Sequence, residues 1–140
     1  MKGQAGIEFI AVFSLILAFF VMMQIYIANQ SFFNSQQSIS TTAVDVLKQI
    51  SSQIQVYSST IGLSGQLILP SYLDAGQTPY TVNVSNSSIV IYWQYLSVNH
   101  TAEQSISIGS IENSSGSSNF ILNSGNTYQI NNTNGQVIIS

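Results

Sequence analysis

The sequence predicts an α+β fold, in which one long N-terminal α-helix (about residues 5–61) precedes a small antiparallel, sandwich-like β-domain. Two observations predict this fold. Glycine and proline are absent from residues 7–61, whereas seven of the nine glycines and both prolines follow that interval. Beyond residue 64 the apolar residues change from helical spacing to alternation, which is typical of strands. We therefore expect the helical segment to end at about residue 62 and the β-domain to occupy 63–140.

The first half of the predicted helix is apolar around its whole circumference. From Phe9 to Ala28 only Ser14 and Gln24 are polar, and about 20 apolar residues suffice to cross the hydrocarbon core of a bilayer. One acid, Glu8, precedes this run, where an ionised side chain is costly unless it has a partner. The segment is typical of a helix surrounded by lipid or by other protein.

The second half of the helix carries one apolar stripe. Among residues rich in Gln and Ser, apolar side chains recur at steps of three and four, at Ile39, Ala43, Val46, Leu47, Ile50, Ile54, Tyr57 and Ile61. This spacing places them on one face of a helix, which we expect to pack on the β-domain. Gly62 is expected to end the helix as a left-handed cap.

Seven short strands are predicted after the helix. They are expected at 66–69, 80–84, 89–95, 105–108, 119–122, 127–130 and 136–139. Polar clusters rich in Ser, Asn and Gly connect them, and the cluster at 85–88 predicts a hairpin. Short strands at this spacing indicate an antiparallel sandwich or a curled sheet that rests on the helix.

The composition restricts the classes of function. Charged residues make up 5% of the chain, against roughly 25% in ordinary soluble domains. Its two basic residues, Lys2 and Lys48, cannot neutralise a row of phosphates, so no nucleic acid is expected as a partner. The chain has no cysteine, which excludes disulfides, thiolate nucleophiles and cysteine metal sites. Solubility depends instead on Ser, Thr, Asn and Gln, which favours an extracellular location.

No pattern predicts an enzyme, a cofactor or a metal site. The single histidine, His100, is expected on a loop as a solvated side chain. The acids Asp74, Glu103 and Glu112 lack the spacing of a carboxylate pair or a calcium loop. The aromatic residues in 92–95 offer faces for sugar stacking, but we favour an interpretation in which they alternate between the two faces of a strand.

The first residues permit a comparison with a known family. Lys2-Gly3-Gln4, followed by Ile7-Glu8-Phe9-Ile10, resembles the class III signal peptide of archaeal type IV pilins. In that family a prepilin peptidase cuts after the glycine, just before the apolar helix. The resemblance covers about 30 residues and implies a pilin fold. It also implies a leader of residues 1–3, cleavage between Gly3 and Gln4, and a helical segment that starts at residue 4.

The resemblance also implies roles for side chains of the apolar helix. Glu8 matches the acid that lies four residues beyond the new N-terminus. It would neutralise that amine, in its own or a neighbouring subunit, and set the axial register; the alternative is an ordinary acid favoured by the helix dipole. Large side chains would form the packed core of a filament, namely Phe9, Phe13, Leu15, Phe19, Phe20 and Tyr26. Their alternative role is lipid contact in a plain membrane anchor, since lipid tails are as apolar as Leu or Phe.

Six Asn-X-Ser/Thr sequons occur in the sequence. Asn29 is excluded as a glycan site because it lies on the helix near the expected filament core. The other five are expected in loops or at strand edges of the β-domain and are candidates for N-glycosylation: Asn83, Asn86, Asn99, Asn113 and Asn131. The alternative is an undecorated polar surface.

The function implied by the resemblance is that of a structural subunit of an extracellular archaeal type IV pilus, a homopolymer that serves surface adhesion. Before assembly the subunit would be inserted in the cytoplasmic membrane. Prepilin peptidase, an assembly ATPase and a membrane platform protein would be partners during biogenesis. The alternatives are an archaellin-like motility subunit, a minor pseudopilin, and a monomeric binding protein held by an uncleaved anchor. Glu8 argues against the archaellin, because archaellins usually lack the matching acid.

Overall fold

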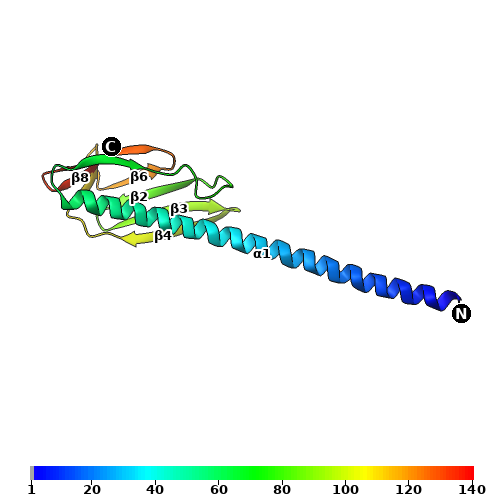
Figure 1. Ribbon diagram of the computed structural model, residues 1–140. Helices are drawn as coiled ribbons and strands as arrows, with labels where there is room; N and C mark the ends of the chain where they lie inside the picture. The colour runs from blue at the N-terminus through cyan, green and yellow to red at the C-terminus, as the bar shows by residue number, and fades with distance from the viewer. Residues whose placement is uncertain (1) are drawn as a thin grey trace. The chain divides into compact units, whose positions relative to one another are not determined.

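The protein is described by a computed structural model that covers residues 2–140, with side chains from residue 6 onward. One helix, α1 (Lys2–Ser59), precedes eight strands (Figure 1). The chain divides into two compact units. The first is the part of α1 up to Gln37, and the second is Ser38–Ser140. The α+β class predicted from the sequence is confirmed.

The first unit consists of helix alone. Its apolar run contains no glycine or proline after Gly6, so nothing interrupts the backbone hydrogen bonds. The hydroxyl of Ser14 donates to the carbonyl oxygen of Ile10 at 2.8 Å, which satisfies a polar group within the apolar run. The helix begins at Lys2, a few residues earlier than predicted.

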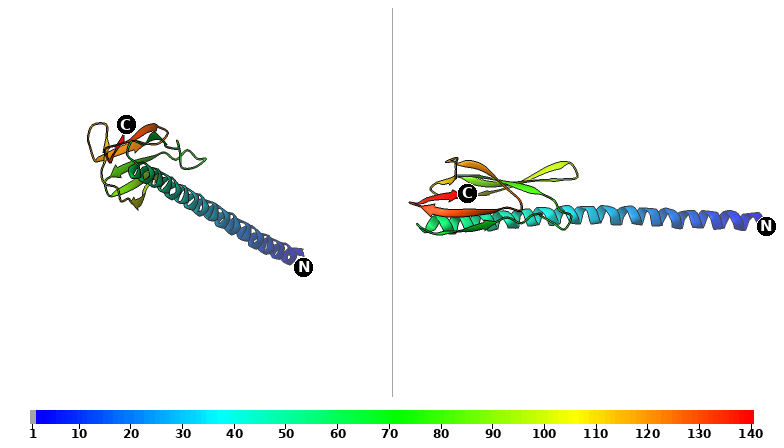
Figure 2. Two further views of the ribbon diagram at one scale, coloured as in Figure 1. Left: turned by 60° about the vertical axis from the view of Figure 1, so that its left-hand side comes forward. Right: turned by 90° about the horizontal axis from the view of Figure 1, so that it is seen from above.

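The second unit contains all eight strands, in two four-stranded sheets (Figure 2). One sheet has the order β1-β7-β8-β5 and the other β4-β3-β2-β6, and every pairing is antiparallel except that of β5 with β8. The strands are β1 (Ser64–Ile68), β2 (Tyr80–Ser85), β3 (Ser88–Tyr95), β4 (Val98–Ser105), β5 (Ile111–Asn113), β6 (Asn119–Asn123), β7 (Thr127–Thr133) and β8 (Gln136–Ile139).

The core of the second unit combines the apolar stripe of α1 with the inward-facing residues of both sheets. The stripe is buried from Ile39 to Ile54, as the spacing predicted, and Tyr57 packs against the core while partly exposed. Ile61 does not belong to the stripe. It follows the end of α1 at Ser59 and is 71% exposed.

The predicted role of Gly62 as a helix cap is wrong, although its left-handed conformation is confirmed. Its φ is 84°, and the amide of Leu63 donates to the carbonyl oxygen of Thr60 at 3.3 Å. Gly62 is therefore the third residue of a turn beyond the helix, a position at which a positive φ favours glycine.

The strand predicted at 105–108 is wrong. β4 occupies Val98–Ser105 instead, and its hairpin with β3 turns at Leu96 and Ser97, which both have positive φ. Two such residues fit the twist of a hairpin, but the usual Asn-Gly signal is absent from the sequence. The expected loop position of His100 is wrong for the same reason. His100 lies within β4 and pairs with Trp93 of β3.

Strand β5 was not predicted. Its three residues, Ile111–Asn113, are too few to show alternation, and they lie where the sequence indicated a polar connection. Pairing with β8 defines this strand, so only tertiary contacts reveal it.

Candidate functional site

The surface of the first unit is the most apolar exposed surface among the described residues. Every large apolar side chain from Ile7 to Phe33 is exposed, by between 46% (Phe32) and 72% (Ile7). Monomeric soluble proteins rarely expose apolar patches larger than a few hundred Å². Such a surface therefore requires lipid or other protein around it.

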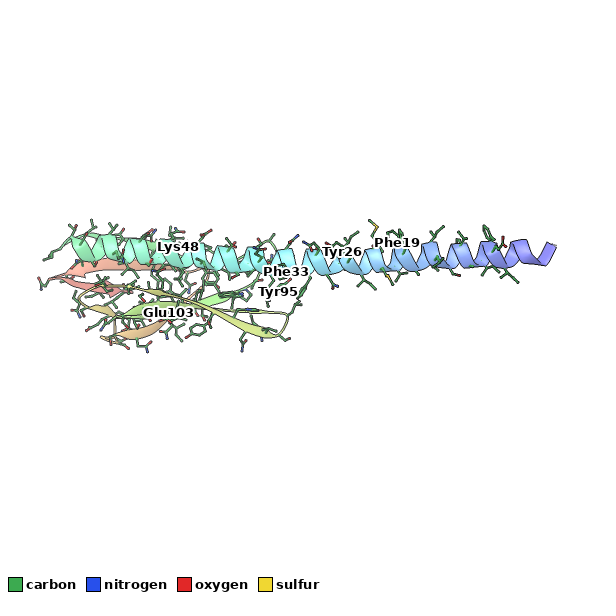
Figure 3. All side chains as sticks on the ribbon, turned by 90° about the horizontal axis from the view of Figure 1, so that it is seen from below. Phe19, Tyr26, Phe33, Lys48, Tyr95 and Glu103 are labelled. Carbon is green, nitrogen blue, oxygen red and sulfur yellow. The ribbon has the colours of Figure 1, made fainter. Side chains whose placement is uncertain are left out.

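The side chains predicted to pack in a filament form two ridges along the helix. At about 100° per residue, Phe9, Phe13 and Phe20 share one face, and Leu15, Phe19 and Tyr26 share a second face about 120° away. Phe9 and Phe13 stack, with ring centroids 6.3 Å apart. Figure 3 labels Phe19 and Tyr26 of the second ridge. Phe33 falls on the second face, whereas Phe32 falls on the third, so the two ridges hold most but not all of the aromatic side chains of this helix.

The third face of this helix carries a short run of small side chains between the large residues Ile7 and Ile25. Ala11, Ser14 and Ala18 follow one another at steps of three and four, so they lie side by side. Small residues on a helix allow a neighbouring helix to approach closely. One helix therefore presents two aromatic ridges and, over residues 11–18, a short patch of small side chains at which a neighbouring helix can approach closely.

Glu8 is exposed and lies at the start of the second ridge, one heptad before Leu15. Gly3 and Gln4 lie within α1, but their side chains are outside the described part of the chain, as is Met1. By length and composition, α1 from Gly6 is the one described helix that qualifies as a membrane span, and a signal sequence near the N-terminus would qualify equally.

The five candidate glycosylation residues occupy different environments in the second unit. Asn86 is in the turn between β2 and β3, Asn99 is near the start of β4, and Asn113 ends β5. Asn83 lies in the middle of β2, between β3 and β6, and Asn131 lies in β7, between β1 and β8. Asn83 and Asn131 are therefore within central strands rather than in loops or at strand edges.

An open groove of about 500 Å³ lies on the sheet formed by β2, β3 and β4. Side chains alternate across a strand, and the registers define two outward rows, namely Thr81, Tyr92 and Thr101, and beside them Pro79, Gln94 and Asn99. The main chain between the two rows forms the floor. We call this feature the outer groove. The sequence did not predict it, because β4 was placed too late in the chain.

The row between the outward rows faces the opposite side of the sheet. It contains Tyr80, Trp93 and His100, which are paired across the three strands. The Trp93 and His100 rings stack at a centroid distance of 5.5 Å. Burial raises the pKa of Tyr80 to about 12, and its hydroxyl has no hydrogen-bond partner in the described chain. This alternation agrees with the interpretation of the 92–95 aromatics as residues on two faces of a strand.

The described residues group no side chains into a metal centre. No three His, Asp or Glu side chains in the described part of the chain are grouped to hold a metal ion. Two features of the described chain remain as candidate functional surfaces: the exposed apolar helix and the outer groove. Comparisons with protein-family models, with curated proteins and with solved structures give no match for this chain.

Proposed function

We propose that this chain is the structural subunit of an extracellular archaeal type IV pilus that serves surface adhesion. In this account the helix up to Gln37 is held in the cytoplasmic membrane, the leader of residues 1–3 is removed, and the mature chain polymerises through that helix. The second unit forms the outer surface of the filament and carries glycans. The motif Lys2-Gly3-Gln4 with Glu8 supports the family, through its resemblance to class III signal peptides.

The observation that carries the proposal is the exposed apolar surface of the helix from Ile7 to Phe33. Burial of apolar surface contributes about 25 cal/mol per Å², so water is excluded as a stable environment for this surface. Moving the helix from lipid into a bundle gains little from the hydrophobic effect, and close packing must then stabilise the bundle. The aromatic ridges and the short patch of small side chains at residues 11–18 supply complementary surfaces for such packing.

Glu8 supports a polymer over a simple anchor. A carboxylate at the start of an apolar run is costly without a partner, and cleavage after Gly3 would create an amine within about one helical turn of it. In a bundle, Glu8 of one subunit would pair with the amine of its own or a neighbouring subunit. In a single anchored chain that keeps residues 1–3, the amine is seven residues before Glu8 in the sequence instead of four.

An archaellin-like subunit is the closest alternative, and Glu8 argues against it. A membrane-anchored monomeric binding protein is the alternative from another class. Assembly of the filament would use a prepilin peptidase, an assembly ATPase and a membrane platform protein.

The intact mass of the chain isolated from its native cells tests the proposal against the anchor. A pilin begins at Gln4, whereas an anchor keeps the segment from Met1 to Gly3. Filaments are sheared from the cells, and the intact mass of the chain is measured in both the released filaments and the membrane pellet. A chain that begins at Gln4 in the released fraction supports the proposal. A chain confined to the membrane with its leader intact would refute it.

A further inference from the structure

We infer that Asn99 is the residue of the second unit that carries an N-linked glycan, and that the outer groove holds the first sugar of that glycan. The inference rests on the proposed function in one respect: the second unit must lie outside the cytoplasm, where it meets the glycan-transfer machinery.

Asn99 and Thr101 are placed as an accessible acceptor. They are two residues apart on β4, which is an edge strand, so both side chains point to the outer face. Both are exposed. Within the described chain, neither side chain forms a hydrogen bond with another residue. The sequon begins one residue beyond the turn at Leu96 and Ser97, after Val98, where β4 is open on its free edge.

In the two sequons around the β2–β3 turn, side chains that glycosylation needs are already buried or hydrogen-bonded within the fold. The hydroxyl of Ser85, needed by the Asn83 sequon, donates to the Ser88 carbonyl oxygen at 2.8 Å and accepts from the Ser88 amide. The Asn83 side-chain oxygen is itself buried. The Asn86 Oδ1 accepts a hydrogen bond from the Ile111 amide at 3.0 Å. The hydroxyl of Ser88, the third residue of the Asn86 sequon, lies 3.4 Å from the Ser85 hydroxyl.

The two remaining sequons of the second unit are also constrained. The Asn113 side-chain oxygen accepts hydrogen bonds from the amides of Ser115 and Ser117, at 3.0 and 2.9 Å. These bonds stabilise the loop that follows β5. Asn131 is partly buried in β7, which is paired on both edges. The Asn99 sequon therefore stands apart from the other four by having both functional side chains exposed and unengaged.

The lining of the outer groove matches a neutral sugar. Tyr92 offers an aromatic ring that is 44% exposed, against which the apolar face of a pyranose can pack. Hydroxyl and amide groups of Thr81, Thr101 and Gln94 border the ring and can hydrogen-bond to sugar hydroxyls. No Asp, Glu, Lys or Arg lines the groove, although His100 belongs to its lining. Its volume lies within the roughly 300–1,000 Å³ of small-molecule sites. Because Asn99 itself forms part of the wall, a sugar attached to it begins inside the groove.

The covalent step requires a sugar donor with a phosphate leaving group on its anomeric carbon. The Asn99 Nδ2 attacks that carbon, the new C–N bond forms, and the C–O bond to phosphate breaks. The phosphate departs with the bonding electron pair, and Nδ2 loses one proton to a base of the transferase. The Thr101 hydroxyl, the third position of the sequon, lies on the same face of β4 as Asn99.

Peptide mass spectrometry of the chain from its native cells tests the modification. Cleavage after Leu96 and Glu103 isolates residues 97–103, which contain Asn99 and no other sequon asparagine. We expect this peptide to carry the added mass of a glycan in most molecules, and expect that mass to vanish in Thr101→Ala and persist in the matched Thr101→Ser variant. An unmodified 97–103 peptide, or higher occupancy at any other sequon than at Asn99, would overturn the inference.

Thermal unfolding tests the role of the groove. The change in melting temperature caused by Tyr92→Ala is measured with the glycan present and in the unglycosylated Asn99→Gln background, and Tyr72→Ala serves as an exposed tyrosine elsewhere. We expect Tyr92→Ala to lower the melting temperature more when the glycan is present, because coupled residues are not additive. Equal effects in both backgrounds would show that the sugar does not occupy the groove.

Filament formation is scored separately by electron microscopy. Filaments built from chain that is unmodified at Asn99 would refute glycosylation at Asn99 and leave the proposed role as a filament subunit intact. A chain that is modified at Asn99 but never forms filaments would refute the proposed function alone.

Discussion

Asn132 of β7 and Tyr57 of α1 are 75 residues apart in the sequence and are joined by a hydrogen bond of 2.8 Å from the Asn132 Nδ2 to the Tyr57 carbonyl oxygen. The same amide donates to the Ser58 carbonyl oxygen at 3.2 Å, and its oxygen accepts the Gly135 amide at 3.0 Å. The last carbonyls of a helix lack partners within the helix. One buried side chain therefore caps α1 and closes the β7–β8 turn.

Replacing Asn132 tests this cap. Asn132→Ala leaves two helix carbonyls and one turn amide without a partner, and we expect a loss of about 2 kcal/mol in the free energy of unfolding. Asn132→Asp should cost more, because a carboxylate cannot donate to carbonyl oxygens. Urea unfolding of the full chain in detergent, followed by Trp93 fluorescence, measures both. Asn119→Ala, at an exposed asparagine, is the control, and equal stability of all variants would exclude the cap.

Gly65 of β1 lies against the hydroxyl end of the Tyr57 side chain. A Cβ at Gly65 would collide with the Tyr57 hydroxyl and approach the Tyr57 Cζ to 2.7 Å. We expect Gly65→Ala to destabilise the second unit by about 1–3 kcal/mol, as overpacking does. Gly109→Ala is the matched control, since a Cβ there meets nothing within 4 Å. Urea unfolding distinguishes the two variants, and equal behaviour would contradict the packing of Tyr57 on β1.

Tyr80 should make stability depend on alkaline pH. Burial raises the pKa of Tyr80 from 10.0 to about 12, so between these values the unfolded chain loses the phenolic proton while the folded chain keeps it. The unfolded state then binds fewer protons, and the free energy of unfolding falls as pH rises, by at most about 1.4 kcal/mol per pH unit. Below pH 10 the full stabilisation linked to the Tyr80 proton is present, because Tyr80 is protonated in both the folded and the unfolded chain.

The variant Tyr80→Phe removes the titrating group. We expect it to flatten the alkaline slope and to cost little stability at neutral pH, because the hydroxyl it deletes has no partner in the described chain. Free energies of unfolding are compared from pH 8 to about pH 12. A slope that persists in Tyr80→Phe would assign the pH dependence to another group.

Glu8 should control assembly and leave folding of the second unit unchanged. We expect Glu8→Gln to reduce the yield of sheared filaments by tenfold or more, since one tenfold change corresponds to only about 1.4 kcal/mol, while the chain still accumulates in the membrane. Glu8→Asp keeps the charge and should retain part of the yield. Asp74→Asn, an acid of the second unit, is the control. If Glu8→Gln gave the same filament yield as the wild type, Glu8 would not set the axial register of the subunits.

Most of the fold was predictable because local pattern and tertiary environment agree. The absence of glycine and proline predicted α1, and the stripe from Ile39 to Ile54 predicted the helix face that is buried. β4 was misplaced because its residues, VNHTAEQS, show no clear apolar alternation at a sheet edge. β5 is defined by a pairing with β8 that no local pattern reveals.

The candidate site was predictable only where it depends on composition. The apolar helix and Glu8 are visible in the sequence, and so are the sequons. The outer groove required the register of β3 and β4, which depends on the positive φ of Leu96 and Ser97. The difference in exposure between Asn99 and Asn83 likewise follows from strand order, which the sequence does not specify.

Electron cryo-microscopy of filaments sheared from native cells tests the central claim most directly. The account predicts a central bundle of helices that begin at Gln4, in which the ridge of Leu15, Phe19 and Tyr26 packs against neighbouring copies. The account would be contradicted if the filament density could not accommodate this sequence and the chain were recovered as a monomer from the membrane, still carrying residues 1–3.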